Sequence, residues 1–93
     1  MADLGFSTVV VRSGDPLTAV VDEELVMLDA RTSAYFGLDG IGTRIWELLE
    51  EPRAVDDVCS VLVEEYEVDL ERCRAEVINF IGELADAQLV EFP

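Results

Sequence analysis

The spacing of the apolar residues changes at Asp39, and this change limits the fold of the chain more than any other feature of its sequence. Before Asp39, apolar residues stand in short runs rich in β-branched and aromatic side chains, which is typical of strands. After it, they recur every three or four residues, which is typical of amphipathic helices. The pattern therefore predicts an α+β domain in which a sheet is followed by helices.

Three short strands are predicted before this point, over residues 17–21, 24–29 and 34–38. Polar turns at residues 22–23 and 30–33 separate them. Strands joined in this way form a three-stranded antiparallel meander, in which the last strand has only one neighbour. One edge of strand 34–38 should therefore keep unpaired backbone N–H and C=O groups.

Three α-helices are predicted after the strands. The first begins at Asp39, a good N-cap, and is ended by Pro52. The second covers about residues 54–65, with apolar residues on one side and acidic residues on the other. The third follows Asp69, another good N-cap, and reaches about Ala87.

The third predicted helix is apolar on two adjacent faces, which is wider than a surface helix needs. The first face contains Leu70, Cys73, Val77, Phe80 and Leu84, and the second contains Arg74, Ile78, Ile81 and Ala85. If this helix lies beside the free edge of strand 34–38, the two form a groove in which an extended peptide can add as a further strand. In the alternative arrangement the sheet packs on the second face and leaves no groove.

The two ends of the chain are less constrained. Residues 1–16 form either an N-terminal arm or an extra strand, because residues 6–12 are rich in β-branched side chains and a turn signal follows them. The main domain is expected over residues 17–93, with the tail 89–92 folding back as a last extended segment. No signal peptide or apolar run of membrane-spanning length occurs, so the protein is expected to be cytoplasmic.

Charge and chemistry exclude several classes of function. The chain has 21 acidic and 6 basic residues, for a formal net charge of −15, so it should repel nucleic acids and anionic membranes. A basic partner should be attracted, unless the charge serves only solubility. There is no His, and Cys59 and Cys73 stand in separate helices without CxxC spacing, so we predict no metal, no cofactor and no catalytic residue. The protein is not expected to be an enzyme.

Several segments resemble the PqqD-like family, whose members are also called RiPP precursor recognition elements. They include a strand ending in Leu-Asp at residues 25–29, Tyr-Phe-Gly-Leu-Asp at 35–39, and Gly-Thr-Arg-Ile-Trp at 42–46. Residues 55–58, 64–68, 80–84 and 89–90 look like the later part of that family. The resemblance implies a winged-helix-like domain that binds the leader of a ribosomally made precursor peptide and presents it to modifying enzymes.

The resemblance also implies where the peptide binds, because in this family the leader adds to the third strand and lies against the third helix. The implied peptide-binding residues are Ala34, Tyr35, Phe36, Gly37 and Leu38 on the strand, and Arg74, Val77, Ile78 and Ile81 on the helix. Tyr35 could instead be a core aromatic. With no enzyme domain attached, the chain looks like the stand-alone members that serve lasso-peptide and quinone-cofactor pathways. We favour a lasso-type pathway with a separate leader peptidase; the alternative is a peptide chaperone for a radical SAM enzyme.

Two other classes of function suit the same elements. A winged-helix DNA-binding protein would need a basic recognition helix, but the second and third predicted helices carry few Arg among many acidic residues. A protein-assembly module could pair the edge strands of two copies. We expect a monomer.

Overall fold

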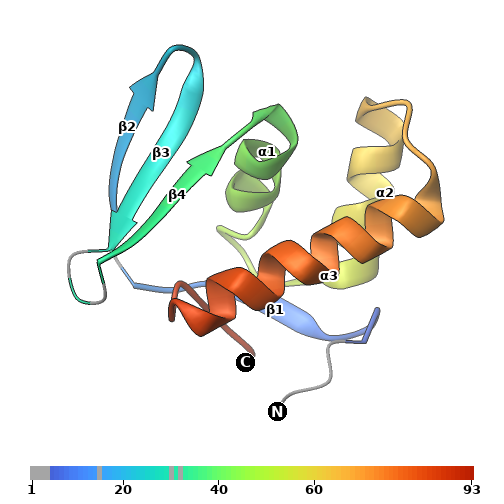
Figure 1. Ribbon diagram of the computed structural model, residues 1–93. Coiled ribbons are helices and arrows are strands. Elements are labelled where there is room, and N and C mark those ends of the chain that lie inside the picture. Colours follow the sequence, from blue (N-terminus) through green and yellow to red (C-terminus); the bar gives the residue numbers. More distant parts are fainter. Residues whose placement is uncertain (1–4, 15, 30, 32) are drawn as a thin grey trace.

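The computed structural model describes residues 5–14, 16–29, 31 and 33–93. The start of the predicted arm, at 1–4, and parts of two predicted turns, at 15, 30 and 32, lie outside the described residues. Figure 1 shows a strand meander on one side of the molecule, with the first helix beside it and the longest helix passing in front. The α+β prediction, a three-stranded antiparallel sheet followed by three α-helices, is confirmed.

The meander consists of β2 (Leu17–Val21), β3 (Glu24–Asp29) and β4 (Ala34–Leu38), paired antiparallel in the order β2-β3-β4. Asp22 and Glu23 form the turn between β2 and β3, with φ angles of 51° and 68°. Positive φ at both central residues gives a hairpin turn whose twist matches that of the strands. The turn therefore fixes the register, in which Leu17 lies opposite Leu28.

The two faces of this sheet differ in burial. Residues paired across antiparallel strands share a face, so Met27 and Phe36 lie on one side and Leu28 and Tyr35 on the other. Met27 is fully buried, whereas Tyr35 is 67% exposed. The sheet is thus covered on one face, and Tyr35 is not a core aromatic.

The three helices are α1 (Gly40–Leu48), α2 (Val55–Glu65) and α3 (Leu70–Asp86). The predicted caps are confirmed: a carboxylate oxygen of Asp39 accepts a hydrogen bond from the Gly42 amide at 2.8 Å, and the Asp69 carboxylate accepts one from the Arg72 amide at 3.2 Å. The N-cap residue of α2 is an alanine, which offers no side-chain acceptor. The first amides of α2 therefore need partners from elsewhere in the chain.

A second, smaller sheet joins the two ends of the chain to the middle. In it β1 (Val9–Arg12) lies between β5 (Arg53–Ala54) and β6 (Val90–Glu91), antiparallel to both. The predicted tail thus forms β6.

The segment before β1 caps α2. The Thr8 carbonyl accepts a hydrogen bond from the Val55 amide at 3.0 Å, and the Phe6 carbonyl accepts one from the Asp56 amide at 2.9 Å. These backbone acceptors replace the missing N-cap side chain. The N-terminal segment is therefore bonded directly to the first turn of a helix more than forty residues away in the chain.

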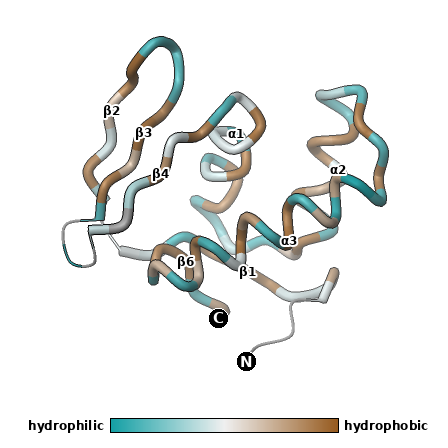
Figure 2. The backbone as a smooth tube through the Cα atoms, in the orientation of Figure 1, coloured by the Kyte–Doolittle hydropathy of each residue, from teal (hydrophilic) through white to brown (hydrophobic). Residues whose placement is uncertain are grey.

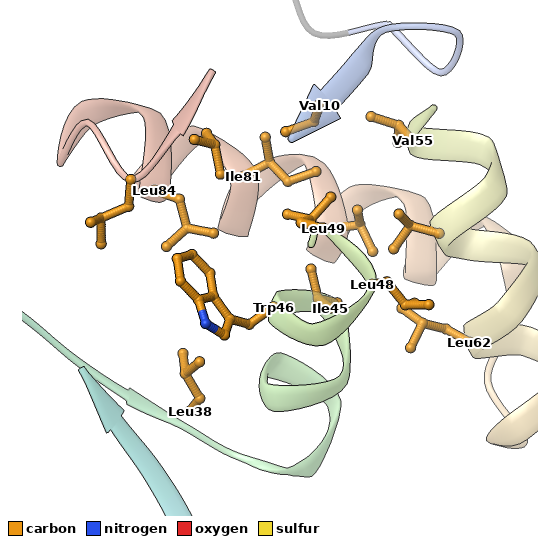
Figure 3. Packing of buried hydrophobic residues seen from close by; sticks show 14 of the residues in the cluster. Val10, Leu38, Ile45, Trp46, Leu48, Leu49, Val55, Leu62, Ile81 and Leu84 are labelled. Atoms are coloured by element: carbon orange, nitrogen blue, oxygen red, sulfur yellow. The ribbon is translucent and has the colours of Figure 1, made fainter. Parts of the chain in front are cut away.

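The core contains side chains from β1, the meander and all three helices, several of which Figure 3 shows together. Val10, Met27, Leu49, Ile81 and Leu84 are fully buried. Both cysteines are buried there as free thiols. In the described part of the chain, no helix combines the length and apolarity that crossing a membrane requires.

Candidate peptide-binding groove

β4 has a free edge. In the sheet order β2-β3-β4 it pairs with β3 alone among the described strands. Its outer backbone groups are therefore available to a further strand, which is the arrangement that β-strand addition uses.

A groove of about 360 Å³ follows this edge. On the strand side it is lined by Phe36, Gly37 and Leu38, with Glu24 of β3 at the same end of the sheet as Leu38. Opposite them stand Glu76, Asn79, Phe80 and Glu83 of α3, and the start of α1 adds Asp39, Ile41, Gly42 and Ile45. The free edge and α3 are thus the two walls of one open groove.

The wall from α3 is a single helical face. Its four residues are spaced three and four apart, so their side chains lie on one side of the helix. Phe80 is half-buried, and the two glutamates and Asn79 are exposed. Figure 2 shows that hydrophobic and hydrophilic positions alternate along α3 as a whole. The groove therefore has an apolar floor with polar groups above it.

The electrostatics of the groove are one-sided. Four of its lining residues are acidic, and no basic residue is among the described residues that line it. The neighbouring Arg44 is held away by Glu65, whose carboxylate it binds through two nitrogens at 2.9 Å each. This contact lowers the pKa of Glu65 and raises that of Arg44. The groove therefore favours a cationic occupant over an anionic one.

Neither cysteine thiol is activated as a nucleophile. Burial raises the pKa of the Cys59 thiol to about 12 and also raises that of Cys73, so both thiols stay protonated near neutral pH. No group of three or more Cys, Asp or Glu in the described residues could hold a metal ion. The groove is suited to binding.

The model of one family, described as Coenzyme PQQ synthesis protein D (PqqD), matches residues 24–90. The chain belongs to the PqqD family. This match confirms the resemblance predicted from the sequence.

Two solved structures are similar to this PqqD-family domain. The one described as TbiB1 in complex with the TbiA(beta) leader peptide is 36% identical, with a TM-score of 0.73, and the alignment covers 87% of this chain and 94% of that one. The one described as lasso peptide synthetase B1 complexed with the leader peptide is 22% identical, with a TM-score of 0.73, covering 88% and 96%; at this identity the likeness concerns the fold alone. A comparison with curated proteins found no match.

In this PqqD-family domain, three of the five predicted strand residues line the groove, namely Phe36, Gly37 and Leu38. Tyr35 points to the outer face of the sheet, where it is exposed. Ala34 begins β4, and its side chain lies outside the described part of the structure. The strand predicted from the sequence is thus the strand that borders the groove.

The predicted α3 residues lie elsewhere in the PqqD-family domain. Val77 and Ile81 are buried in the core, at 1% and 0% exposure, and Ile78 is half-buried against it. Arg74 is paired with Asp56 at 3.2 Å, and its guanidinium lies 4.4 Å from the centre of the Phe6 ring. The N-terminal segment therefore covers the side of α3 on which Arg74 lies, and none of the four residues lines the groove.

Glu76, Asn79 and Glu83 are absent from the predicted site because they are polar, and Phe80 was predicted on the core face of α3. The sequence feature that could have indicated this face is the placement of Phe80 among three polar residues on one side of the helix. A large aromatic side chain in such a place belongs neither to the core nor to an ordinary polar surface.

Proposed function

We propose that this domain binds the leader segment of a ribosomally synthesised precursor peptide by β-strand addition to β4, and presents it to a separate modifying enzyme or leader peptidase. The observation that carries the proposal is the free edge of β4 beside a groove of about 360 Å³. A peptide adding there would pair its backbone with β4 and turn alternate side chains into the groove. The PqqD family match and the 36% identical leader complex support this.

The contact surface that we propose combines β4 with the groove face of α3. Phe36, Gly37 and Leu38 would meet the peptide on one side and Phe80 on the other. Residues 34 and 35 would contribute through their backbone. Arg74, Val77, Ile78 and Ile81 would act indirectly, because they hold α3 in place against the core and the N-terminal segment. Residues 17–93 would form the binding domain.

We favour a lasso-type pathway over a quinone-cofactor pathway. The family description names coenzyme PQQ synthesis, but one of the two similar solved structures is described as lasso peptide synthetase B1 complexed with the leader peptide. The reaction itself would take place on the partner enzyme, since the thiols of this domain are buried and protonated. We expect a monomer whose peptide carries basic residues, because a net charge of −15 opposes self-association and attracts cations.

DNA binding is not favoured. Arg44, Arg72 and Arg74 of the helices each contact a carboxylate of this chain. Phosphate groups would have to displace these contacts within a strongly anionic molecule.

Fluorescence anisotropy tests the proposal, with the TbiA(beta) leader peptide and the leader of any precursor encoded beside the gene as labelled probes. We expect saturable binding that Phe80→Glu weakens at least ten-fold, because the new carboxylate would enter the apolar floor. Leu70→Glu is the matched control: it makes the same kind of change on α3 at a residue that is 41% exposed and does not line the groove. Absence of binding, or equal losses in the two variants with folded circular dichroism spectra, would contradict the proposal.

A further inference from the structure

We infer that the groove selects a peptide segment in which an apolar anchor residue is flanked by lysine or arginine, and that Glu24 and Glu83 recognise these cations. The inference rests on the proposed function and adds the residues that set its specificity.

The apolar anchor follows from the groove floor. Phe36, Ile41 and Phe80 line it and are only half-buried. A peptide side chain placed over them would remove the remaining apolar surface from water, which is favourable in proportion to the area covered. The anchor is therefore a large aliphatic or aromatic residue.

The flanking cations follow from the two unpaired carboxylates. Of the four acidic residues in the groove, Asp39 caps α1 at 2.8 Å and Glu76 contacts Arg72 at 3.3 Å. The side chains of Glu24 and Glu83 are exposed and make no hydrogen bond or ion pair with any described residue. A peptide that fills the groove would take water from both carboxylates, which disfavours a neutral or acidic neighbour and favours a basic one.

These two carboxylates lie toward opposite ends of the floor. Glu24 precedes Leu25, which pairs with Leu38 at the end of β4 that leads into α1. Glu83 lies toward the C-terminal end of α3. This end is near the start of β4, because the carbonyl of Gln88, which follows α3, accepts a hydrogen bond from Arg31, which precedes β4.

The spacing along α3 gives the length of peptide that lies beside this wall of the groove. Glu76, which also borders a small cavity with Ile41 and Ile45, marks the α1 end of this helix face. Glu83 is two helical turns further on, about 10 Å along the axis. An extended peptide covers that span in about three residues. The α3 wall therefore runs beside about three residues of an extended peptide, and the anchor is one of them.

Selection from a library of random dodecapeptides by mRNA display tests this inference. Three proteins serve as bait: the wild type, the groove variant Glu24→Gln/Glu83→Gln, and the control variant Glu64→Gln/Glu67→Gln. Glu64 and Glu67 are exposed and lie outside the groove, so the control removes the same charge elsewhere. We expect the wild type and the control to enrich an apolar anchor flanked by Lys or Arg, and the groove variant to enrich the anchor alone.

A binding measurement then gives the size of the effect. For a synthetic peptide of the selected consensus, replacing one flanking Lys by Gln should weaken binding to the wild type about three-fold, as expected of an exposed ion pair. The groove variant should bind the two peptides equally.

The outcomes separate the inference from the proposed function. If the wild type enriches peptides that carry the anchor without basic residues, the inference is overturned and the proposed function stands. Basic enrichment that persists in the groove variant would also overturn it, because the overall charge would then be the cause. If no peptide is enriched by any of the three folded proteins, the proposed function fails as well.

Discussion

Gly37, within β4, has free space where a side chain would stand. A Cβ added there would meet no heavy atom within 4 Å. Glycine inside a strand loses more backbone entropy on folding than alanine does, so Gly37→Ala should raise the free energy of unfolding by about 0.5–1 kcal/mol. Urea denaturation measures this. Gly14 is the contrast: its φ is +75° and an added Cβ would lie 3.1 Å from Arg31, so Gly14→Ala should be destabilising.

A destabilising Gly37→Ala would contradict the free space seen at this position. A variant that is more stable but binds the peptide less well would instead indicate that glycine is kept for close approach of the peptide backbone.

Cys59 should make the free energy of unfolding decrease with rising pH in the alkaline range. Its pKa is raised from 9.0 to about 12, chiefly by burial. Because the folded pKa lies above the unfolded one, the protonated thiol stabilises the folded state fully below about pH 9, and this contribution is lost as the pH rises toward 12. Unfolding free energies between pH 8 and about 10.5 should therefore fall more steeply for the wild type than for Cys59→Ala. Parallel slopes would show that this thiol ionises equally in both states.

At the scale of elements, α3 shows which part of the site could be predicted from the sequence. Its buried residues, Cys73, Val77, Ile81 and Leu84, come from both of the predicted apolar faces. At about 100° per residue, the groove face and the side bearing Arg74 lie on opposite flanks of this buried line. The spacing of apolar residues indicates which flank of a helix is covered by the rest of the chain. On α3 this is the flank that bears Arg74, and the N-terminal segment covers it. On α3, three of the four residues that line the groove are polar, so the spacing of apolar residues alone could not indicate this face.

The cap of α2 depends on an element distant in sequence. Removing residues 1–8 would leave the Val55 and Asp56 amides without their carbonyl partners, so we expect a loss of about 1–3 kcal/mol in unfolding free energy. Ala54→Ser should restore about 1 kcal/mol in the shortened chain, because its hydroxyl can accept from the first turn, and much less in the full chain. Urea denaturation of the four proteins gives both values. Equal gains in the long and short chains would contradict capping by the N-terminal segment.

At the scale of the whole molecule, contacts close in sequence were easier to predict than distant ones. The meander and the caps at Asp39 and Asp69 depend on residues within a few positions, and they were predicted correctly. The sheet that places β1 between β5 and β6 joins segments some forty and eighty residues apart, and no local pattern specifies such partners. The same limit applies to the groove, whose walls come from β4 and α3.

The overall charge and the groove carboxylates should act at different steps of binding. The field of a molecule with net charge −15 attracts a basic peptide before contact, and salt screens it over a Debye length of about 8 Å at physiological ionic strength. By stopped-flow anisotropy, we expect the on-rate of a basic peptide to fall about ten-fold between low and high salt. The variant Glu24→Gln/Glu83→Gln removes only two of 21 acidic residues, so it should keep this on-rate and raise the off-rate. If the on-rate does not change with salt, the net charge contributes only to solubility. If the variant shows a lower on-rate and an unchanged off-rate, both glutamates act in the encounter and not in the bound complex.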